Sequence, residues 1–398
     1  MIMLIYEQRF RRAVEALNAH GIDAWLIAGR ETYMLREPSF MYLLPVDPFP
    51  RTAVVITAKG GRICITSRME CEEMQSLGLF DEVVAFSAEK PYERCITEAI
   101  KSCMPMSCVA LNFSKSDPSA DGLTHSFYLI LERCIKDAGF AGSIESSAPV
   151  MKMVRGKKSD EEVNNIALAV AEAMRVYEEA RPRMRAGMSG MDVQRLFQGI
   201  VDAKGFEYSW PKRGNPYVSV GTRSSYLCKA PPADVYIQPG DLVNVDLGIR
   251  VNGFASDNQR SFYALRAGET RPPAEILRAW NTVRQINREV CAAMKTGISS
   301  ASLTETGNRV MLENGYESGW KGGFGHEIGL FAHNGGIVLG FGTPEDLDDT
   351  LEENMVFTSE PAIITPYGRL CQEEVVRVTS RGGVMLSAPQ EEVWLILN

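Results

Sequence analysis

Residues 246–262 read DLGIRVNGFASDNQRSF, two apolar runs on either side of the dipeptide Asn252-Gly253. Asn-Gly is a favoured two-residue connection between antiparallel strands, because both residues tolerate a positive φ. This register places Asp257 opposite Gly248, one diagonal step from Asp246 and about 7–8 Å from it between backbones. We therefore expect both carboxylates on one face of a hairpin. The missing side chain of Gly248 is expected to leave open space for an ion between them.

Residues 353–379 repeat this pattern. An apolar run ends on Glu360, a turn signal follows at 365–368, and the return strand carries Glu373. The two glutamates are separated by an odd number of residues, so a regular hairpin places them on one face. Four acids facing one pocket repel one another unless cations neutralise them, and a buried charge must be paired or bind metal. The sequence therefore predicts a metal site between the two hairpins.

A histidine completes the donor set. His326 lies in the glycine-rich segment 322–330, GGFGHEIGL, where glycines let the backbone approach a site closely. A lone histidine is more often a core residue than a ligand, but His333 follows seven residues later and the chain has only 4 histidines. His20 and His125 are interpreted as surface or interdomain residues.

Two further acids lie near the predicted ligands. Asp241 and Glu374 are expected to be solvated or to cap helices, not to bind metal. The five donors are predicted to hold two divalent ions: Asp246, Asp257, His326, Glu360 and Glu373. Oxygen-rich ligation with one imidazole favours manganese, with cobalt, iron or zinc as alternatives.

Composition limits the class of protein. The 398 residues are 45% hydrophobic and 23% charged, enough for two folded domains. The net charge of −8 and a pI near 5.3 do not suggest a nucleic-acid or anionic-membrane partner. No stretch reaches the ~18 apolar residues of a membrane span, and the start MIMLIYEQRF has few apolar residues, so we expect neither a spanning helix nor a secretion signal. Nine cysteines without a CxxC pair argue against a disulfide framework, so a cytoplasmic protein is expected.

Two domains are predicted, with a boundary near 150–160. Residues 1–155 alternate between helical and extended segments and predict an α/β domain. Residues 156–398 predict an α+β domain, whose first helix begins at the capping box formed by Ser159 and Glu162. Helices are expected at 7–20, 91–103, 122–138, 159–181, 190–204, 272–294 and 301–313, and strands at 24–28, 52–57, 63–65, 107–111, 216–220, 241–249, 254–264, 354–364 and 370–379.

Four segments carry a specific resemblance: DLGIRVNGFASDNQRSF, GHEIGLFAHN, ENMVFTSEPAI and QEEVVRVT. They resemble the signature blocks of the pita-bread metallopeptidase superfamily, which includes methionine aminopeptidase, aminopeptidase P, prolidase and creatinase. Residues 1–155 are similar to the creatinase-type N-terminal domain, which indicates the aminopeptidase P, prolidase and creatinase branch. The resemblance implies an α+β fold, with a pita-bread catalytic domain at 156–398 preceded by a creatinase-like α/β domain at 1–155.

The resemblance also implies roles for the donors. Asp246 would bind one ion, His326 and Glu360 the other, and Asp257 and Glu373 would bridge the two. Glu360 would also carry a proton to the leaving amine. Creatinase works without metal and lacks the full ligand set, so the five donors argue against its mechanism here.

Substrate-binding residues are expected at His333, Lys229 and Arg369. His333 corresponds to the family's second histidine, which stabilises the oxyanion or positions the scissile amide. The family's usual histidine about 17 residues before the first aspartate is absent, and Cys228 or Lys229 stands near its place.

Two more positions differ from the family pattern. The usual arginine two residues before the last glutamate is Cys371, although Arg369 lies two residues further back on the same strand face. The usual acid after the second histidine is Asn334. Such changes affect substrate binding more than metal binding.

Three functions fit these residues. The first is a dinuclear metallohydrolase that cleaves an amide bond, as an Xaa-Pro dipeptidase or aminopeptidase does, acting on a short peptide or small molecule. The second is a non-peptidic hydrolase or lyase of this fold acting on a small nitrogenous or sulfonium metabolite. The third is a catalytically silent peptide-binding module, in which loss of ligands would be expected. By analogy with the family, a homodimer is the expected assembly.

Overall fold

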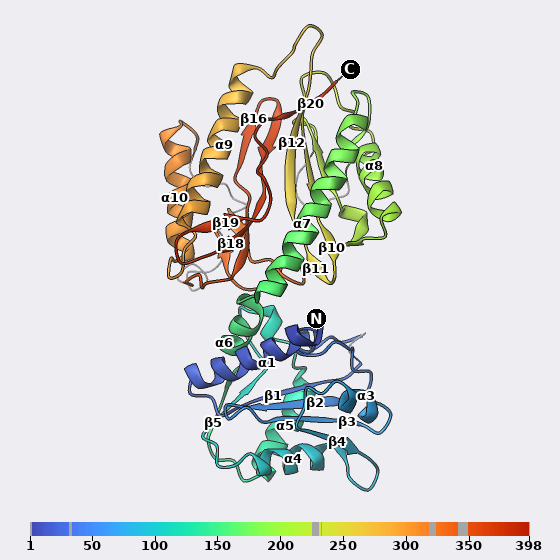
Figure 1. The fold of residues 1–398 in the computed structure, drawn as a ribbon, viewed down its shortest axis with the longest axis vertical. Coiled ribbons are helices and arrows are strands. Elements are labelled where there is room, and N and C mark those ends of the chain that lie inside the picture. The colour runs from blue at the N-terminus through green and yellow to red at the C-terminus, as the bar shows by residue number, and fades with distance from the viewer. Residues whose placement is uncertain are drawn as a thin grey trace. The chain divides into compact units, whose positions relative to one another are not determined.

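Two compact units make up the protein, Met1–Lys157 and Lys158–Asn398 (Figure 1). The computed structural model describes residues 2–31, 34–224, 231, 233–317, 324–340 and 349–397. The described cysteines are all free thiols.

The first unit is a six-stranded sheet with the order β4-β3-β2-β1-β5-β6. The β1–β2 and β2–β3 pairs are antiparallel, and the other pairs are parallel. Its strands are β1 (Ala24–Gly29), β2 (Thr52–Thr57), β3 (Arg62–Ser67), β4 (Glu82–Phe86), β5 (Cys108–Leu111) and β6 (Ser143–Ser146). Its helices are α1 (Ile2–Ala19), α2 (Pro38–Leu43), α3 (Cys71–Ser76), α4 (Tyr92–Ser102), η1 (Pro118–Ala120), α5 (His125–Asp137), α6 (Ala148–Met151) and η2 (Lys152–Gly156).

Helices α4 and α5 cover one face of this sheet and bury a core with apolar side chains of β1, β2 and β5. Helix α1 contacts β2 and lies with α6 on the other side of the sheet (Figure 1). The first helix begins at Ile2, five residues before the predicted start at 7. Gly21 follows it with φ +65°, as its predicted role at the helix end requires.

A buried carboxyl sits in this first unit. Glu37 Oε1 accepts hydrogen bonds from the Ser39 backbone N–H at 3.1 Å and from Asn112 Nδ2 at 2.6 Å. Asn112 Oδ1 in turn accepts from Trp25 Nε1 and from the Ser147 hydroxyl, each at 2.6 Å. Burial raises the pKa of Glu37 to about 7, even though these donors favour the ionised form.

The second unit places two helix pairs around its strands. The predicted capping box is confirmed: Ser159 Oγ accepts from the Glu162 backbone N–H, and the Glu162 carboxylate accepts from the Ser159 backbone N–H. Helices α9 and α10 lie on one side of the strands, and α7 and α8 on the other (Figure 1). The helices are α7 (Asp160–Ala180), η3 (Arg181–Arg183), α8 (Gly190–Ala203), η4 (Lys212–Gly214), α9 (Ala274–Ala293) and α10 (Ser300–Glu313).

The strands of this unit form several small sheets, the largest with the order β20-β12-β9-β8. They are β7 (Glu207–Tyr208), β8 (Tyr217–Val220), β9 (Leu242–Leu247), β10 (Ile249–Val251), β11 (Phe254–Ala255), β12 (Asn258–Ala264), β13 (Gly325–His326), β14 (Val338–Leu339), β15 (Val356–Ser359), β16 (Ala362–Thr365), β17 (Gly368–Cys371), β18 (Glu374–Val378), β19 (Gly383–Met385) and β20 (Trp394–Ile396).

The four long strands predicted for the hairpins are each interrupted. The prediction of continuous strands at 241–249, 254–264, 354–364 and 370–379 was wrong in this respect. The breaks fall at Gly248, Asp257, Glu360 and Glu373, where the backbone leaves one small sheet before it enters the next. Three of the predicted metal ligands therefore lie at interruptions of the strand ladder.

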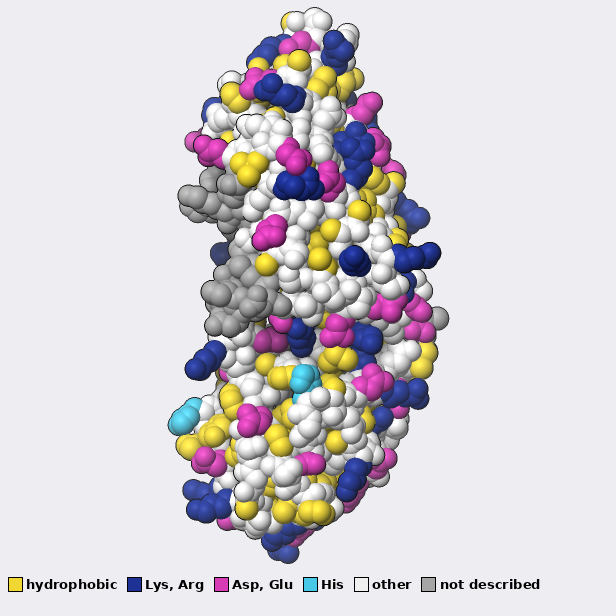
Figure 2. All heavy atoms as spheres, turned by 90° about the vertical axis from the view of Figure 1, so that its left-hand side faces the viewer, with side chains coloured by type: hydrophobic (Ala, Val, Ile, Leu, Met, Phe, Trp, Pro, Cys, Tyr) yellow, Lys and Arg dark blue, Asp and Glu magenta, His cyan; other side chains and the backbone are white. Residues whose placement is uncertain are grey.

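On the face drawn in Figure 2, lysines and arginines lie among aspartates and glutamates and do not gather into one basic area. Within the described ranges, no helix is both long enough and apolar enough to cross a membrane.

Candidate metal centre

The first hairpin has the predicted register. Arg250 pairs with Ala255, and the two-residue turn at Asn252-Gly253 has φ values of +52° and +81°. Both positive values suit a type I′ turn. Leu247 pairs with Asn258, so the next position of the same register sets Gly248 opposite Asp257. Asp257 therefore lies one diagonal step from Asp246 across the hairpin.

The predicted role of Gly248 was wrong. A Cβ added at Gly248 would lie 2.2 Å from the Trp210 ring and 2.8 Å from Ser209 Cβ. The missing side chain thus makes room for the indole ring, which stacks on Tyr217 at 5.7 Å between ring centroids. This glycine is needed for close packing beside the site, not for an open space between the two aspartates.

The second hairpin is also regular. Thr365 pairs with Gly368 across the turn Pro366-Tyr367, and Ser359 pairs with Glu374 in the same register. Continuing this register sets Glu360 opposite Glu373. The two glutamates thus lie directly opposite each other and share a face, as expected, whereas the two aspartates are diagonal neighbours.

His326 reaches the same place from β13. Its backbone N–H donates to Thr358 Oγ1 at 3.1 Å, and its ring is buried. The preceding Gly325 has φ +152°, and a Cβ there would lie 2.1 Å from the Thr358 carbonyl oxygen. Only glycine permits this approach, which fixes the histidine beside β15.

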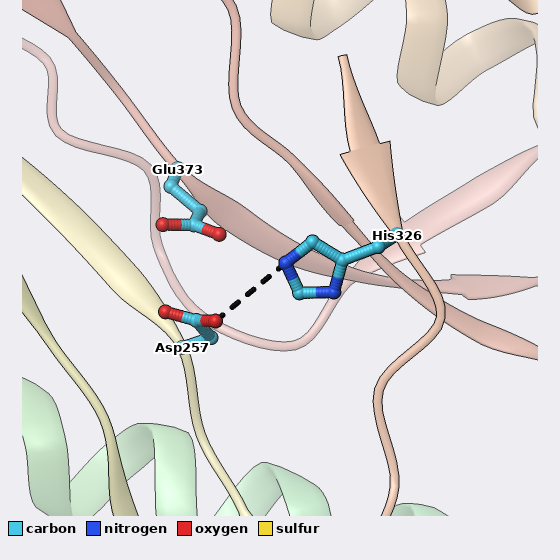
Figure 3. Close-up of side chains that lie close together, drawn as sticks. All are labelled: Asp257, His326 and Glu373. Carbon is cyan, nitrogen blue, oxygen red and sulfur yellow. Dashed lines mark ion pairs between the residues drawn. The ribbon is translucent and has the colours of Figure 1, made fainter. Parts of the chain in front are cut away.

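Side chains from three separate strand ends point toward one another in Figure 3. One ligand atom each of Asp257, His326 and Glu373 lies within 4.8 Å of the others. His326 Nε2 is 3.6 Å from Asp257 Oδ2 and 3.6 Å from Glu360 Oε1. Asp246 faces the group, since its charge raises the pKa values of both Asp257 and Glu360.

The electrostatics of these groups show the cost of placing four acids together. Burial and the charges of Glu373, Asp246 and Glu360 raise the pKa of Asp257 well above its usual range. Burial and the charge of Glu360 do the same to the pKa of Glu373. Burial and the charge of Asp246 raise the pKa of Glu360 to about 8. Without a cation, the cluster therefore retains protons at neutral pH.

The imidazole has the opposite shift. Burial and the neighbouring His333 lower the pKa of His326 to about 3, so the ring is neutral. A neutral imidazole offers a lone pair, as metal ligation requires.

The residues fit divalent cations. Glu373 Oε2 is buried and receives no hydrogen bond from the described residues, although a buried oxygen of this kind normally has a partner. Four carboxylates with one imidazole suit hard or borderline divalent ions. Cations would replace the protons that the raised pKa values hold, and would give Glu373 Oε2 its missing partner.

The predicted substrate-binding residues are placed differently from one another. His333 is exposed, and its ring lies 4.3 Å from the His326 ring between centroids. Arg369 is buried and donates to Asn244 Oδ1 at 2.8 Å and to Gln259 Oε1 at 2.5 Å. Lys229 and Cys228 lie outside the described residues.

The two other departures from the family pattern also have defined contacts. Asn334 Nδ2 donates to Glu327 Oε1 at 2.9 Å, and the same oxygen accepts from the buried Lys158 ammonium at 2.9 Å. The buried Cys371 thiol donates to the Glu360 carbonyl oxygen at 3.5 Å. Asn334 and Cys371 thus support the backbone around the ligands.

Two acids that were expected to be solvated are instead ion-paired. Glu374 is fully buried and pairs with Arg260 at 3.0 Å. Asp241 pairs with Arg223 at 2.5 Å. The expectation of solvated acids was therefore wrong. Glu374 points away from the ligands because neighbouring residues of a strand face opposite sides.

Sequence reasoning missed Gln259, which lies directly opposite Asp246 in the β9–β12 ladder. Its amide Nε2 donates to Glu360 Oε2 at 3.0 Å. The signal was its spacing, because a residue two positions after Asp257 projects from the same face of the strand.

Two hairpins and a histidine strand between paired helices make up an α+β domain with a buried candidate metal site. The sequence pattern of metallopeptidase family M24 matches residues 163–387. The chain belongs to this family, whose pita-bread fold it shares, and the predicted superfamily and α+β fold class are confirmed.

Relatives extend along the whole chain. An Xaa-Pro dipeptidase from Pyrococcus horikoshii is 24% identical over 393 residues, 98% of this chain and 100% of that protein. A putative dipeptidase, YkvY, from Bacillus subtilis is 25% identical and covers 80% of this chain and 82% of its own length.

Solved structures share the fold. An Xaa-Pro dipeptidase from Bacillus anthracis has a TM-score of 0.75 at 20% identity and covers 98% of this chain and 100% of its own. Dipeptidase PepE from Mycobacterium ulcerans has a TM-score of 0.73 at 21% identity, with full coverage of both chains.

Proposed function

We propose that this protein is a dinuclear metal-dependent hydrolase that cleaves an amide bond next to a proline-like nitrogen, as an Xaa-Pro dipeptidase or aminopeptidase does. The observation that carries the proposal is the convergence of Asp257, His326 and Glu373 within 4.8 Å, with Glu360 beside the same imidazole nitrogen. Membership of family M24 and the dipeptidase relatives support the reaction class.

Five side chains would hold the ions. Asp246 would bind one ion, His326 and Glu360 the other, and Asp257 and Glu373 would bind both, as the family resemblance implies. Two divalent ions, for which manganese is our proposal, would lower the pKa of an attacking water and polarise the amide carbonyl.

Glu360 is the proposed acid–base group. Its side chain is 13% exposed, against 6% for the side chain of Asp257. Asp246 and Glu373 are also buried. A carboxylate at the accessible edge can take a proton from the attacking water and return it to the leaving nitrogen. Gln259 Nε2 donates to Oε2 of Glu360, and Oε1 lies 3.6 Å from His326 Nε2.

His333 is proposed to contact the substrate. Its exposed ring lies beside His326, at the edge of the buried ligands. An imidazole N–H at this edge can donate to the oxyanion that forms as the amide is attacked. Lys229 remains a proposed substrate contact on the resemblance alone.

A short peptide is the proposed substrate, because the relatives that cover 98% and 80% of the chain are named as a dipeptidase and a putative dipeptidase. Location in the cytoplasm and assembly as a homodimer stay predictions. Sedimentation of the purified protein tests the dimer.

The test is a substrate screen of the manganese-loaded protein, with an Asp257→Asn variant as the matched blank. We expect hydrolysis of Xaa-Pro dipeptides such as Ala-Pro, and at least a tenfold lower rate on Ala-Ala. A loaded protein that hydrolyses none of these peptides contradicts the proposal. Turnover of a small nitrogenous or sulfonium metabolite in the same screen would then favour a non-peptidic hydrolase or lyase. A protein that binds no metal would instead favour a catalytically silent peptide-binding module.

A further inference from the structure

Gln259 occupies a central position among the proposed ligands. It is 1% exposed and pairs with Asp246 across the β9–β12 ladder. Its backbone carbonyl accepts from the Glu373 backbone N–H at 3.2 Å. The residue is thus fixed at both its backbone and its side chain within the cluster.

The amide nitrogen of Gln259 serves the two glutamates of the second hairpin. Nε2 donates to Glu360 Oε2 at 3.0 Å, and the same side chain keeps the pKa of Glu373 lower than burial alone would set it. A primary amide has two N–H donors, so one nitrogen can serve both carboxylates. The two acids, which face each other and repel, share a neutral donor.

Arg369 decides which end of the amide faces the glutamates. Its Nη1 donates to Gln259 Oε1 at 2.5 Å and to Asn244 Oδ1 at 2.8 Å. A guanidinium has donors and no acceptor, so only the amide oxygen can face it. The NH₂ group must then point toward Glu360 and Glu373. Reversal of the amide would set its oxygen against two carboxylates.

The two oxygens of Glu360 consequently have different surroundings. Oε2 accepts from Gln259, and Oε1 lies 3.6 Å from His326 Nε2. Only Oε1 faces the imidazole with which Glu360 is proposed to share an ion.

We propose that Gln259, oriented by Arg369, is a positioning residue that holds Glu360 and Glu373 as metal ligands and turns Glu360 Oε1 toward His326. Arg369 then acts through Gln259 and not by direct contact with the substrate. This inference rests on the proposed function and adds two residues to its site. Outer partners of metal ligands typically contribute about 10- to 100-fold to metal affinity or activity.

The test measures Mn²⁺ affinity by calorimetry without substrate, and kcat and KM on Ala-Pro afterwards. The variants are Gln259→Met, Arg369→Met, Arg369→Lys and the double Met variant. Gln194→Met is the matched control, because Gln194 is also buried and its Nε2 donates to the Pro216 carbonyl oxygen away from the cluster.

We expect Gln259→Met to weaken Mn²⁺ binding about 10- to 100-fold and to lower kcat with little change in KM. Arg369→Met should act in the same direction, the double variant should be no worse than Gln259→Met alone, and Arg369→Lys should recover part of the loss. Gln194→Met should leave Mn²⁺ affinity unchanged, and circular dichroism checks that each variant is folded.

Three results would overturn the inference. Unchanged Mn²⁺ affinity in Gln259→Met, with a wild-type protein that binds the metal, would show that Gln259 does not position the ligands. Additive losses in the double variant would show that Arg369 acts independently of Gln259. A raised KM for Arg369→Met with unchanged Mn²⁺ affinity would make Arg369 a substrate contact. Failure of the proposed function is distinct, since the wild-type protein itself would then bind no Mn²⁺ or hydrolyse no peptide.

Discussion

Binding of Mn²⁺ to the metal-free protein at pH 7 is expected to release at least about one proton. A carboxyl with a pKa of about 8, such as Glu360, is roughly nine-tenths protonated at pH 7. The pKa values of Asp257 and Glu373 are raised as well, and their protons add to the count. A carboxylate must lose its proton to bind a metal, so each proton appears in solution.

The pH dependence follows from the same shift. Each released proton makes the apparent affinity for Mn²⁺ rise about tenfold per pH unit, about 1.4 kcal/mol, and the contribution of Glu360 levels off above pH 8. The folded-state pKa of Glu360 lies above its ordinary value of 4.5. Its contribution to the stability of the metal-free protein is therefore complete below pH 4.5 and is lost as the pH rises through 8.

The assay is calorimetry of Mn²⁺ binding in several buffers of different ionisation enthalpy at pH 7. The slope of the observed enthalpy against the buffer's ionisation enthalpy counts the released protons. Glu37→Gln is the matched control, because this buried glutamate belongs to the first unit and should leave the slope unchanged. Equal enthalpies in all buffers would refute the reasoning, since the acids would then be ionised before metal arrives.

Four substitutions give further predictions. Asp257→Asn should lose both bound metal and activity. Glu374→Gln should lower the unfolding free energy by about 3–5 kcal/mol, because it breaks the buried ion pair with Arg260, and should keep the affinity for Mn²⁺. Denaturation and calorimetry measure the two effects, and metal loss in Glu374→Gln would mean that the register is misread. His333→Ala should lower kcat with metal content unchanged, and a preparation that lacks ions by elemental analysis would contradict its role. Glu37→Gln should stabilise the protein by about 3 kcal/mol at pH 8 and by little at pH 5. The pKa of Glu37, about 7, lies above the ordinary 4.5, so the stability that the protonated carboxyl contributes in the wild type is lost as the pH rises through this range. Equal urea midpoints for the variant and the wild type at pH 8 would count against this prediction.

Local signals in the sequence were sufficient for much of the site. Asn252-Gly253 specifies a tight turn, and the turn sets the register that brings Asp257 beside Asp246. The capping box at Ser159 similarly marks the first helix of the second unit. Such features depend on residues close in sequence, so they can be read without the tertiary structure.

Features that depend on distant residues could not be read in this way. The use of Gly248 is decided by Trp210, which packs into its place from another segment. Glu374 forms an ion pair because Arg260, which is distant in sequence, lies beside it. The amide of Gln259 is oriented by a hydrogen bond from Arg369, which is also distant in sequence. A sequence shows which side chains share a strand face but not what packs against that face.

Two divalent cations are proposed to hold the clustered acids together. Anomalous diffraction from a Mn²⁺-soaked crystal, recorded at the manganese edge, tests it most directly. We predict two peaks among five side chains: Asp246, Asp257, His326, Glu360 and Glu373. A map without peaks there, from a crystal whose protein hydrolyses Ala-Pro, would contradict the account.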